Sequence, residues 1–117
     1  MDDIDFSEIA RLEVKIDQAT AKTQAMVKLA VKKTGLDTVT GAQTLVPVDS
    51  GNLKSTIGVD FDPDGYGFEA GATANYAAYV EYGTSRMAPQ PYLGPAFGRT
   101  SAAFVKAIES IGGKVLE

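Results

Sequence analysis

The feature that most constrains this fold is a long run of apolar residues at helical spacing in the first third of the chain. An apolar position recurs every three or four residues, which predicts an amphipathic helix. Asp5 and Glu8 form a possible capping box, with Ser7 as a competing N-cap, so the helix is expected to begin near Ser7. The same spacing resumes after Gly35, which extends the helical region over 7–45, with a bend or restart at the glycine. The first stripe comprises Ile9, Leu12, Ile16, Ala19, Thr23, Met26 and Ala30.

The expected helix is long for a domain of this size. From Ser7 to Thr34 it would measure about 42 Å at 1.5 Å per residue. A compact domain of this size has a radius of gyration of ~13 Å and is roughly 35 Å across. The helix should therefore extend beyond its own globule. The exposed part of the apolar stripe then needs a partner, for which a second copy of the chain is the simplest candidate.

Residues 46–75 are expected to form a turn followed by a β-hairpin. Pro47 ends the helical pattern and pushes Val46 toward extended geometry. Farther along, apolar residues alternate with polar or small ones on both sides of an Asp-Pro-Asp-Gly turn at 62–65, a pattern typical of two antiparallel strands. The alternating positions are Ile57, Val59, Phe61, Tyr66, Phe68 and Ala70.

The last third divides into a segment rich in tyrosine and proline at 76–95 and a helix at 95–112. The first part, to Tyr82, is ambiguous between helix and strand, and 83–95 is expected to be an irregular loop because it holds three prolines. Gly112-Gly113 would end the final helix. The order of elements predicts one α+β domain over 1–117, with a long N-terminal helix, a central antiparallel hairpin or small sheet, and a C-terminal helix.

Composition excludes several classes of function. The chain has no Cys and no His, which excludes disulfides, thiol nucleophiles, Ser-His triads and the usual zinc sites. Eleven Lys and Arg stand against fifteen Asp and Glu, a net charge of −4 that disfavours tight binding to a nucleic-acid backbone. No apolar run approaches the ~18 residues that span a bilayer. The acidic first residues are unlike a secretory signal.

The acidic turn at 60–65 is the most tempting candidate for a metal site. Asp60, Asp62 and Asp64 match the opening of a calcium-binding loop, in which alternate carboxylates face one cation. The match fails at the twelfth position, where Gly71 replaces the bidentate Glu, and both flanks are expected to be strands. An acidic hairpin tip is therefore favoured over a calcium site.

Glu81 and the tyrosines around it are the other candidate site. Glu81 is the only acid in an apolar and aromatic segment, and Arg86 follows five residues later. A buried ion pair between Glu81 and Arg86, or a pair across a subunit boundary, is favoured over a general base. Four tyrosines either form a contact surface or close the core beneath the proline-rich loop, and both interpretations stay open. They are Tyr76, Tyr79, Tyr82 and Tyr92.

Two stretches carry a more specific resemblance. Residues 46–57, VPVDSGNLKSTI, resemble the signature PVDTG-x-L-(K/R)-x-S-I. Residues 76–96, YAAYVEYGTSRMAPQPYLGPA, resemble YA-x-x-VE-(F/Y)-GT…M-x-x-QP-(F/Y)-(L/M)-x-PA. Both signatures belong to the siphophage neck, or tail-completion, morphogenesis proteins, which are similar in role to the minor tail protein Z of lambda-like phages. Ser50 and Thr56 are conservative departures from the pattern.

The resemblance implies a structural protein of the virion, with no catalysis and no cofactor. Such proteins are made in the cytoplasm of the bacterial host and lie where the DNA-filled head meets the tail. They would form a ring of identical copies, six-fold rather than twelve-fold, around the DNA channel. Their partners would be the head connector or stopper and the tail terminator or tail tube. DNA would pass through without specific binding, and no membrane is involved.

The resemblance also suggests roles for individual residues. The first signature would shape the turn between the long helix and the hairpin, and the second would fix the start of the loop and supply its contact surface. Glu81→Ala is accordingly expected to impair assembly more than folding. The residues concerned are Pro47, Asp49, Gly51, Leu53, Tyr76, Tyr79, Glu81, Tyr82, Gly83, Thr84, Arg86, Pro89, Gln90, Pro91, Tyr92 and Pro95.

Two other functions remain as alternatives. A tail terminator, which caps the tail tube, would share the size, the ring and the location of a neck protein, but its loss would give overlong tubes. A small calcium-binding regulatory domain would use the three aspartates of the acidic turn, and calcium would then raise its melting temperature.

Overall fold

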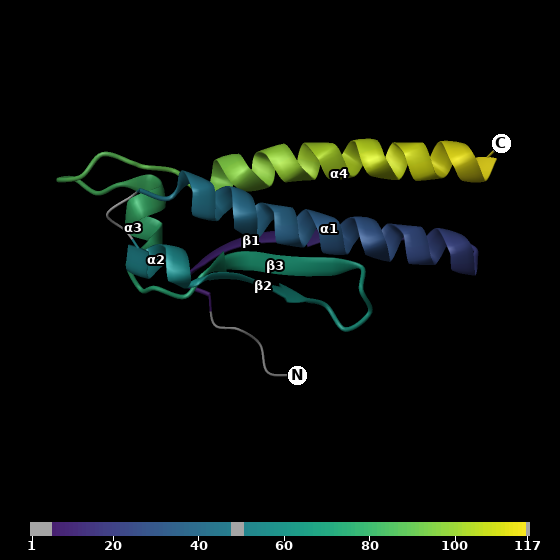
Figure 1. The fold of residues 1–117 in the computed structure, drawn as a ribbon, viewed down its shortest axis with the longest axis horizontal. Coiled ribbons are helices and arrows are strands. Elements are labelled where there is room, and N and C mark those ends of the chain that lie inside the picture. The colour runs from purple at the N-terminus through teal and green to yellow at the C-terminus, as the bar shows by residue number, and fades with distance from the viewer. Residues whose placement is uncertain (1–5, 48–50, 117) are drawn as a thin grey trace.

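A computed structural model of the chain describes residues 6–47 and 51–116. The molecule is elongated, with principal extents of 54 × 29 × 21 Å and a radius of gyration of 15.8 Å (Figure 1). The expected α+β fold, with a long N-terminal helix and a C-terminal helix, is confirmed. The elements in chain order are β1 (Glu8–Glu13), α1 (Ala21–Leu45), α2 (Gly51–Ser55), β2 (Ile57–Phe61), β3 (Gly67–Ala72), α3 (Ala77–Tyr82) and α4 (Leu93–Leu116).

The expected helix start near Ser7 is wrong, because residues 8–13 form the strand β1. β1 pairs antiparallel with β3 along its whole length, from Glu8 opposite Ala72 to Glu13 opposite Gly67. Successive side chains of a strand point to opposite faces. Ile9 is therefore 48% exposed whereas Leu12 is buried, although both belong to the expected helical stripe. Asp5, the other half of the expected capping box, lies outside the described residues.

Helix α1 begins at an N-cap that lies farther along the chain than the expected start near Ser7. Thr20 is its N-cap, and the Thr20 hydroxyl accepts a hydrogen bond from the Thr23 backbone N–H at 3.1 Å. The helix runs without interruption through Gly35 and ends one residue before Val46, close to the expected stop at Pro47. A Cβ atom at Gly35 would lie 2.7 Å from the Phe61 ring. This glycine lets the helix approach the sheet and does not end it.

The expected hairpin is confirmed as β2 and β3, and β1 adds a third strand to give the order β1-β3-β2, antiparallel throughout. The turn after β2 is closed by Gly65, which has φ +83°, and by the Asp64 carboxylate, which accepts from the Tyr66 backbone N–H at 2.9 Å. One face of the sheet carries buried apolar residues. These include Leu12, Phe68, Ala70, Ala72 and Ile57.

Helices α1 and α4 lie side by side, run in opposite directions, and pack against this buried face (Figure 1). Phe68 at the sheet centre is fully buried and meets the Phe97 ring of α4 edge-on, with ring centroids 6.3 Å apart. Farther along the helix pair, the Thr38 and Thr100 hydroxyls share a hydrogen bond of 2.7 Å. The sheet and the two helices therefore form two layers over one continuous core.

The C-terminal helix is longer than expected. α4 starts at Leu93 and runs to Leu116, so Gly112 lies within the helix and does not end it. A helical glycine costs only about 1 kcal/mol relative to alanine. Ile111, directly before it, is buried in the core with Phe104, which favours continuing the helix. In the described part of the chain, no helix combines the length and the apolar character needed to cross a membrane.

Candidate functional site

The candidate site is the loop that joins α3 to α4, residues 83–92, which projects from one end of the molecule (left in Figure 1). Its outer part is a tight turn. The Thr84 backbone N–H donates to the Met87 carbonyl at 2.8 Å, and the Met87 N–H donates back to Thr84 at 3.3 Å. Ser85 and Arg86 form the exposed tip between them.

Gly83 makes this turn possible. Its φ is +77°, a left-handed conformation that favours glycine. A Cβ atom there would lie 2.7 Å from the Met87 carbonyl oxygen and 2.8 Å from the Pro89 nitrogen. The backbone of residues 87–89 therefore passes directly over the glycine. The loop is tied back to the body by Gln90, whose backbone N–H donates to the Val80 carbonyl at 2.8 Å. The projecting loop is thus closed by its own backbone.

Glu81 anchors the other end of the loop. The side chain is only 5% exposed, and its carboxylate accepts three backbone hydrogen bonds from the start of α4. Oε1 accepts from Tyr92 N at 3.2 Å and from Leu93 N at 2.8 Å, and Oε2 accepts from Gly94 N at 3.0 Å. The first N–H groups of a helix lack intrahelical partners and carry partial positive charge. A carboxylate accepts their hydrogen bonds and is attracted to that charge.

This geometry corrects the expected ion pair of Glu81 with Arg86 within the chain. Arg86 lies at the exposed tip, and the structure places no salt bridge between these two side chains. The carboxylate of Glu81 binds the backbone N–H groups at the start of α4 instead of the Arg86 guanidinium. Gly94 leaves room for the carboxylate, because a Cβ atom there would lie 2.9 Å from Glu81 Oε2.

The tyrosines divide between core and surface. Tyr92, expected on the contact surface, is fully buried, and its hydroxyl donates to the Ala77 carbonyl at 3.3 Å. Burial, together with the charge of Glu81, raises the pKa of Tyr92. Tyr76 is half-buried, and its hydroxyl accepts from Asn52 Nδ2 at 3.1 Å. Tyr79 and Tyr82, by contrast, are 58% and 68% exposed.

Tyr82 also contacts a second buried acid. Its hydroxyl donates to Glu8 Oε1 at 3.2 Å. Burial raises the pKa of Glu8, although the Tyr82 hydrogen bond opposes this and the charge of Glu81 adds to it. The negative charge of Glu8 in turn raises the pKa of Tyr82. The N-terminal strand is thereby linked to the helix that begins the loop.

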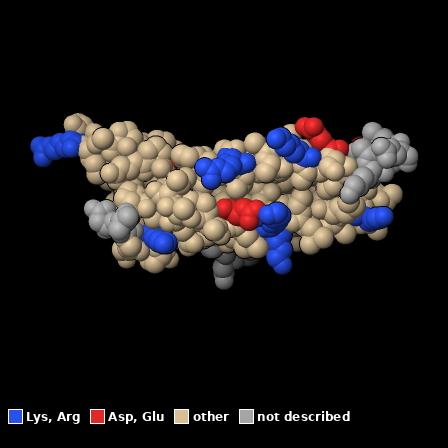
Figure 2. All heavy atoms as spheres, turned by 45° about the horizontal axis from the view of Figure 1, so that its top comes forward, with Lys and Arg blue, Asp and Glu red and all other residues tan. Residues whose placement is uncertain are grey.

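The surface next to the tip is apolar and exposed. Met87 is 39% exposed, Arg86 and Pro95 are exposed, and Arg86 is the only charged residue between Glu81 and Arg99. Figure 2 shows a basic side chain at the end of the molecule where the loop lies. The loop end combines two tyrosines, a methionine and one cation, a composition typical of protein contact surfaces. Its remaining exposed members are Thr84, Pro89, Gln90 and Pro91.

The two stretches that carry the family resemblance meet in space. Leu53 of the first is fully buried in the same core cluster as Ala77, Val80 and Tyr92 of the second. Pro47 is half-buried, whereas Gly51 is exposed with open space around it, and Asp49 lies outside the described residues. The first stretch therefore supports the base of the loop.

The acidic turn does not gather its carboxylates. Asp62 accepts two hydrogen bonds from Arg11, at 3.0 and 2.7 Å, and Asp64 is occupied by the turn backbone. Among the residues that the structure describes, no group of three acidic side chains is placed to hold a metal ion. The geometry therefore offers the calcium alternative no ligand cluster.

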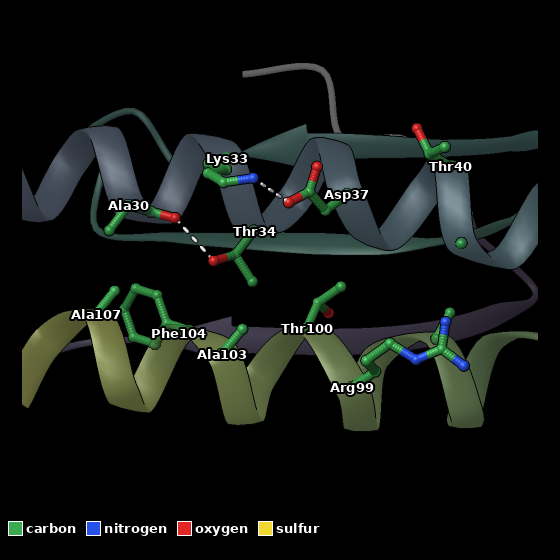
Figure 3. A pocket seen from close by; sticks show the side chains of 12 residues that line it. Ala30, Lys33, Thr34, Asp37, Thr40, Arg99, Thr100, Ala103, Phe104 and Ala107 are labelled. Atoms are coloured by element: carbon green, nitrogen blue, oxygen red, sulfur yellow. Dashed lines mark hydrogen bonds and ion pairs between the residues drawn. The ribbon is translucent and has the colours of Figure 1, made fainter.

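A shallow groove between α1 and α4 was not expected from the sequence. Its volume is about 410 Å³, and Figure 3 shows small side chains such as Ala30 and Thr34 facing Ala103 and Thr100 across it. An ion pair of 2.7 Å between Lys33 and Asp37 lies at its edge. Helical spacing of small residues in both segments was the only signal that could have indicated this groove.

Comparison with known proteins gives one match. The family model HK97-gp10_like, whose description reads "Bacteriophage HK97-gp10, putative tail-component", matches residues 10–83. The matched region includes most of β1, both strands of the hairpin, and α3 with Glu81. Neither the curated proteins nor the solved structures compared with the chain gave a match.

Proposed function

Because the chain belongs to the HK97-gp10-like family of phage tail components, we propose that it is a structural protein of the head–tail junction. In this role it completes the tail and joins it to the head connector. The observation that carries the proposal is the loop at one end of the elongated body, which is exposed at its tip and anchored at its base by Glu81.

The construction of the loop suits docking onto a neighbouring protein. Ordering a flexible segment on binding costs free energy, and a segment that is already closed avoids much of that cost. Here the Thr84–Met87 hydrogen bonds, the Gln90 bond to α3 and the Glu81 anchor hold the backbone before any partner arrives. The exposed apolar and aromatic surface beside the tip provides the contact area.

The proposed assembly is a ring of identical copies, six-fold, around the DNA channel. Its neighbours are the connector or stopper on the head side and the tail terminator or tail tube on the other. The net charge of −4 supports a channel through which DNA slides without being held, since an acidic protein does not neutralise the phosphate backbone.

The test is electron microscopy of particles from a lysate in which this gene carries an early stop codon. Filled heads beside separate tails of normal length are the expected result. Overlong tail tubes would refute the joining role and assign the chain as a tail terminator. Intact, infectious virions would refute both roles.

Complementation in the same lysate tests the loop itself. A plasmid-borne parent chain should restore whole virions, and Arg86→Ala should restore fewer of them. Lys106→Ala is the matched control, because it removes an exposed cation from the middle of α4, away from the loop. Equal restoration by both variants would contradict a contact role for the loop tip.

A further inference from the structure

The face of the sheet that points away from the helices has one row with few side chains. In the described residues, α1 and α4 both pack on the opposite face. Ile9, Gly71 and Gly58 lie opposite one another on the three strands. Ile9 is 48% exposed, and nothing lies within 4 Å of a Cβ atom built at Gly58. Gly71 and Gly58 carry no side chain, so the row is low beside Ile9, and it is called the trough below. Gly71 itself is buried against β1, and Gly58 is the open position.

The next row of the same face is acidic. Arg11, Glu69 and Asp60 are paired across the three strands, and Arg11 also contacts Glu13 and Asp62. Arg11 contacts Asp62 at 2.7 Å, Glu13 at 2.9 Å and Glu69 at 3.8 Å. One guanidinium therefore contacts three carboxylates, and Asp60 opposite Glu69 adds a fourth to this face, so the face keeps a surplus of negative charge next to the trough.

The loop end carries a positive charge. Arg86 is exposed at the tip and is the only charge in that part of the chain. Met87 and Tyr82, 39% and 68% exposed, lie near it in sequence and supply apolar surface. A cation beside apolar groups complements an acidic row beside an apolar trough. The loop projects away from the sheet at the end of the molecule, so a single copy does not bring the two surfaces together (Figure 1).

We propose that the loop tip of one copy docks on the outward sheet face of a second copy. Arg86 then faces the acidic row at Asp60 and Glu69, and Met87 lies over the glycines beside Ile9. This inference rests on the proposed ring. The two surfaces differ, so the contact is heterologous, and such contacts form a ring when the rotation from one copy to the next closes.

Disulfide cross-linking tests the contact in assembled particles. The chain has no cysteine, so every disulfide that this chain forms uses an introduced residue. Ser85→Cys on the tip and Gly58→Cys in the trough are combined in one chain, both at open positions. Mild oxidation of particles should give a ladder of dimers, trimers and larger species on a non-reducing gel. Ser85→Cys paired with Glu109→Cys, which is exposed on α4, is the control.

The expected result is a clear ladder for the trough pair and loss of that ladder in the control pair. No ladder in normally assembled particles that contain the chain would overturn the inference and leave the head–tail role intact. A ladder from the control pair alone would also overturn it. Infectious virions that lack the chain would instead overturn the proposed function itself.

Charge-reversal variants test the same contact without introduced cysteines. Arg86→Asp and Asp60→Arg should each lower the yield of complete virions, and the two together should restore it. In Asp60→Arg the new side chain lies opposite Glu69, which limits damage to folding. Melting temperatures within a few degrees of the parent check this. A double variant no better than the worse single variant would contradict the pairing.

Discussion

Replacing Glu81 by alanine removes the carboxylate that holds the start of α4. Three backbone N–H groups, those of residues 92, 93 and 94, lose their acceptor, and the first two belong to buried residues, as does Glu81, which is only 5% exposed. A hydrogen bond to a charged group contributes about 1.5–3 kcal/mol, and a buried donor left unpaired costs about 1–3 kcal/mol. The favourable interaction of the carboxylate with the helix dipole is lost as well.

These contributions overlap, so they do not add in full. A loss of about 3–5 kcal/mol is the expected size, the same as for breaking a buried charged pair by removing one partner. Domains of this size have a total stability of about 5–15 kcal/mol. The melting temperature should therefore fall by roughly 10–25 °C. This reverses the expectation from the resemblance that Glu81→Ala impairs assembly more than folding.

Thermal unfolding followed by circular dichroism measures the change. Glu81→Gln should lose less, because one amide oxygen still accepts while the NH₂ group faces donors. Glu109→Ala removes the same charge from the exposed surface of α4 and should shift the melting temperature by no more than about 2 °C. If Glu81→Ala melts within about 3 °C of the parent, the anchoring role is refuted.

Three further predictions concern the sheet and its contacts. Gly71→Ala should prevent stable folding, since its Cβ atom would lie 1.8 Å from the Glu8 carbonyl oxygen; a native-like melting curve would contradict this. Gly35→Ala should destabilise by about 1–2 kcal/mol in urea, because overpacking against Phe61 at 2.7 Å outweighs the gain in helix propensity. Burial raises the pKa of Glu8 above 4.5, so its ionisation opposes folding, and stability should fall as pH rises from 4.5 through the folded-state pKa. Glu8→Gln should therefore melt higher than the parent at pH 7 and equally at pH 4; a difference that persists at pH 4 would refute this.

Much of the central region was predictable because its signals are local. The turn at 62–65 and the alternation on both sides of it indicate two strands, and the structure has β2 and β3 there. Pro47 correctly marks the end of α1 because the ring excludes helical geometry for the residue before it. The two signatures led to the phage tail family, which the match over residues 10–83 supports independently.

The site was predictable in position but not in its chemistry. The sequence singled out Glu81 as an acid in an apolar segment, and it is buried as expected. The sequence did not predict that Glu81 binds the backbone N–H groups of α4, because every residue other than proline has such a group. A nearby arginine, by contrast, is visible in the sequence as a possible partner. Tyr92 could not be separated from Tyr79 for a similar reason: an aromatic side chain suits a core and a contact surface equally well, and only the packing of α4 decides which tyrosine is covered.

By itself, the sequence determined the elements whose causes lie within a few residues: the hairpin, the proline stop, and the amphipathic character of the long helices. Only the tertiary structure decided the rest. Residues 8–13 became a strand because β3 offers a free edge to pair with, a contact between segments far apart in the chain. α4 runs through Gly112 because the core favours Ile111 in a helix. In both cases burial and pairing with distant residues outweighed a local preference of about 1 kcal/mol.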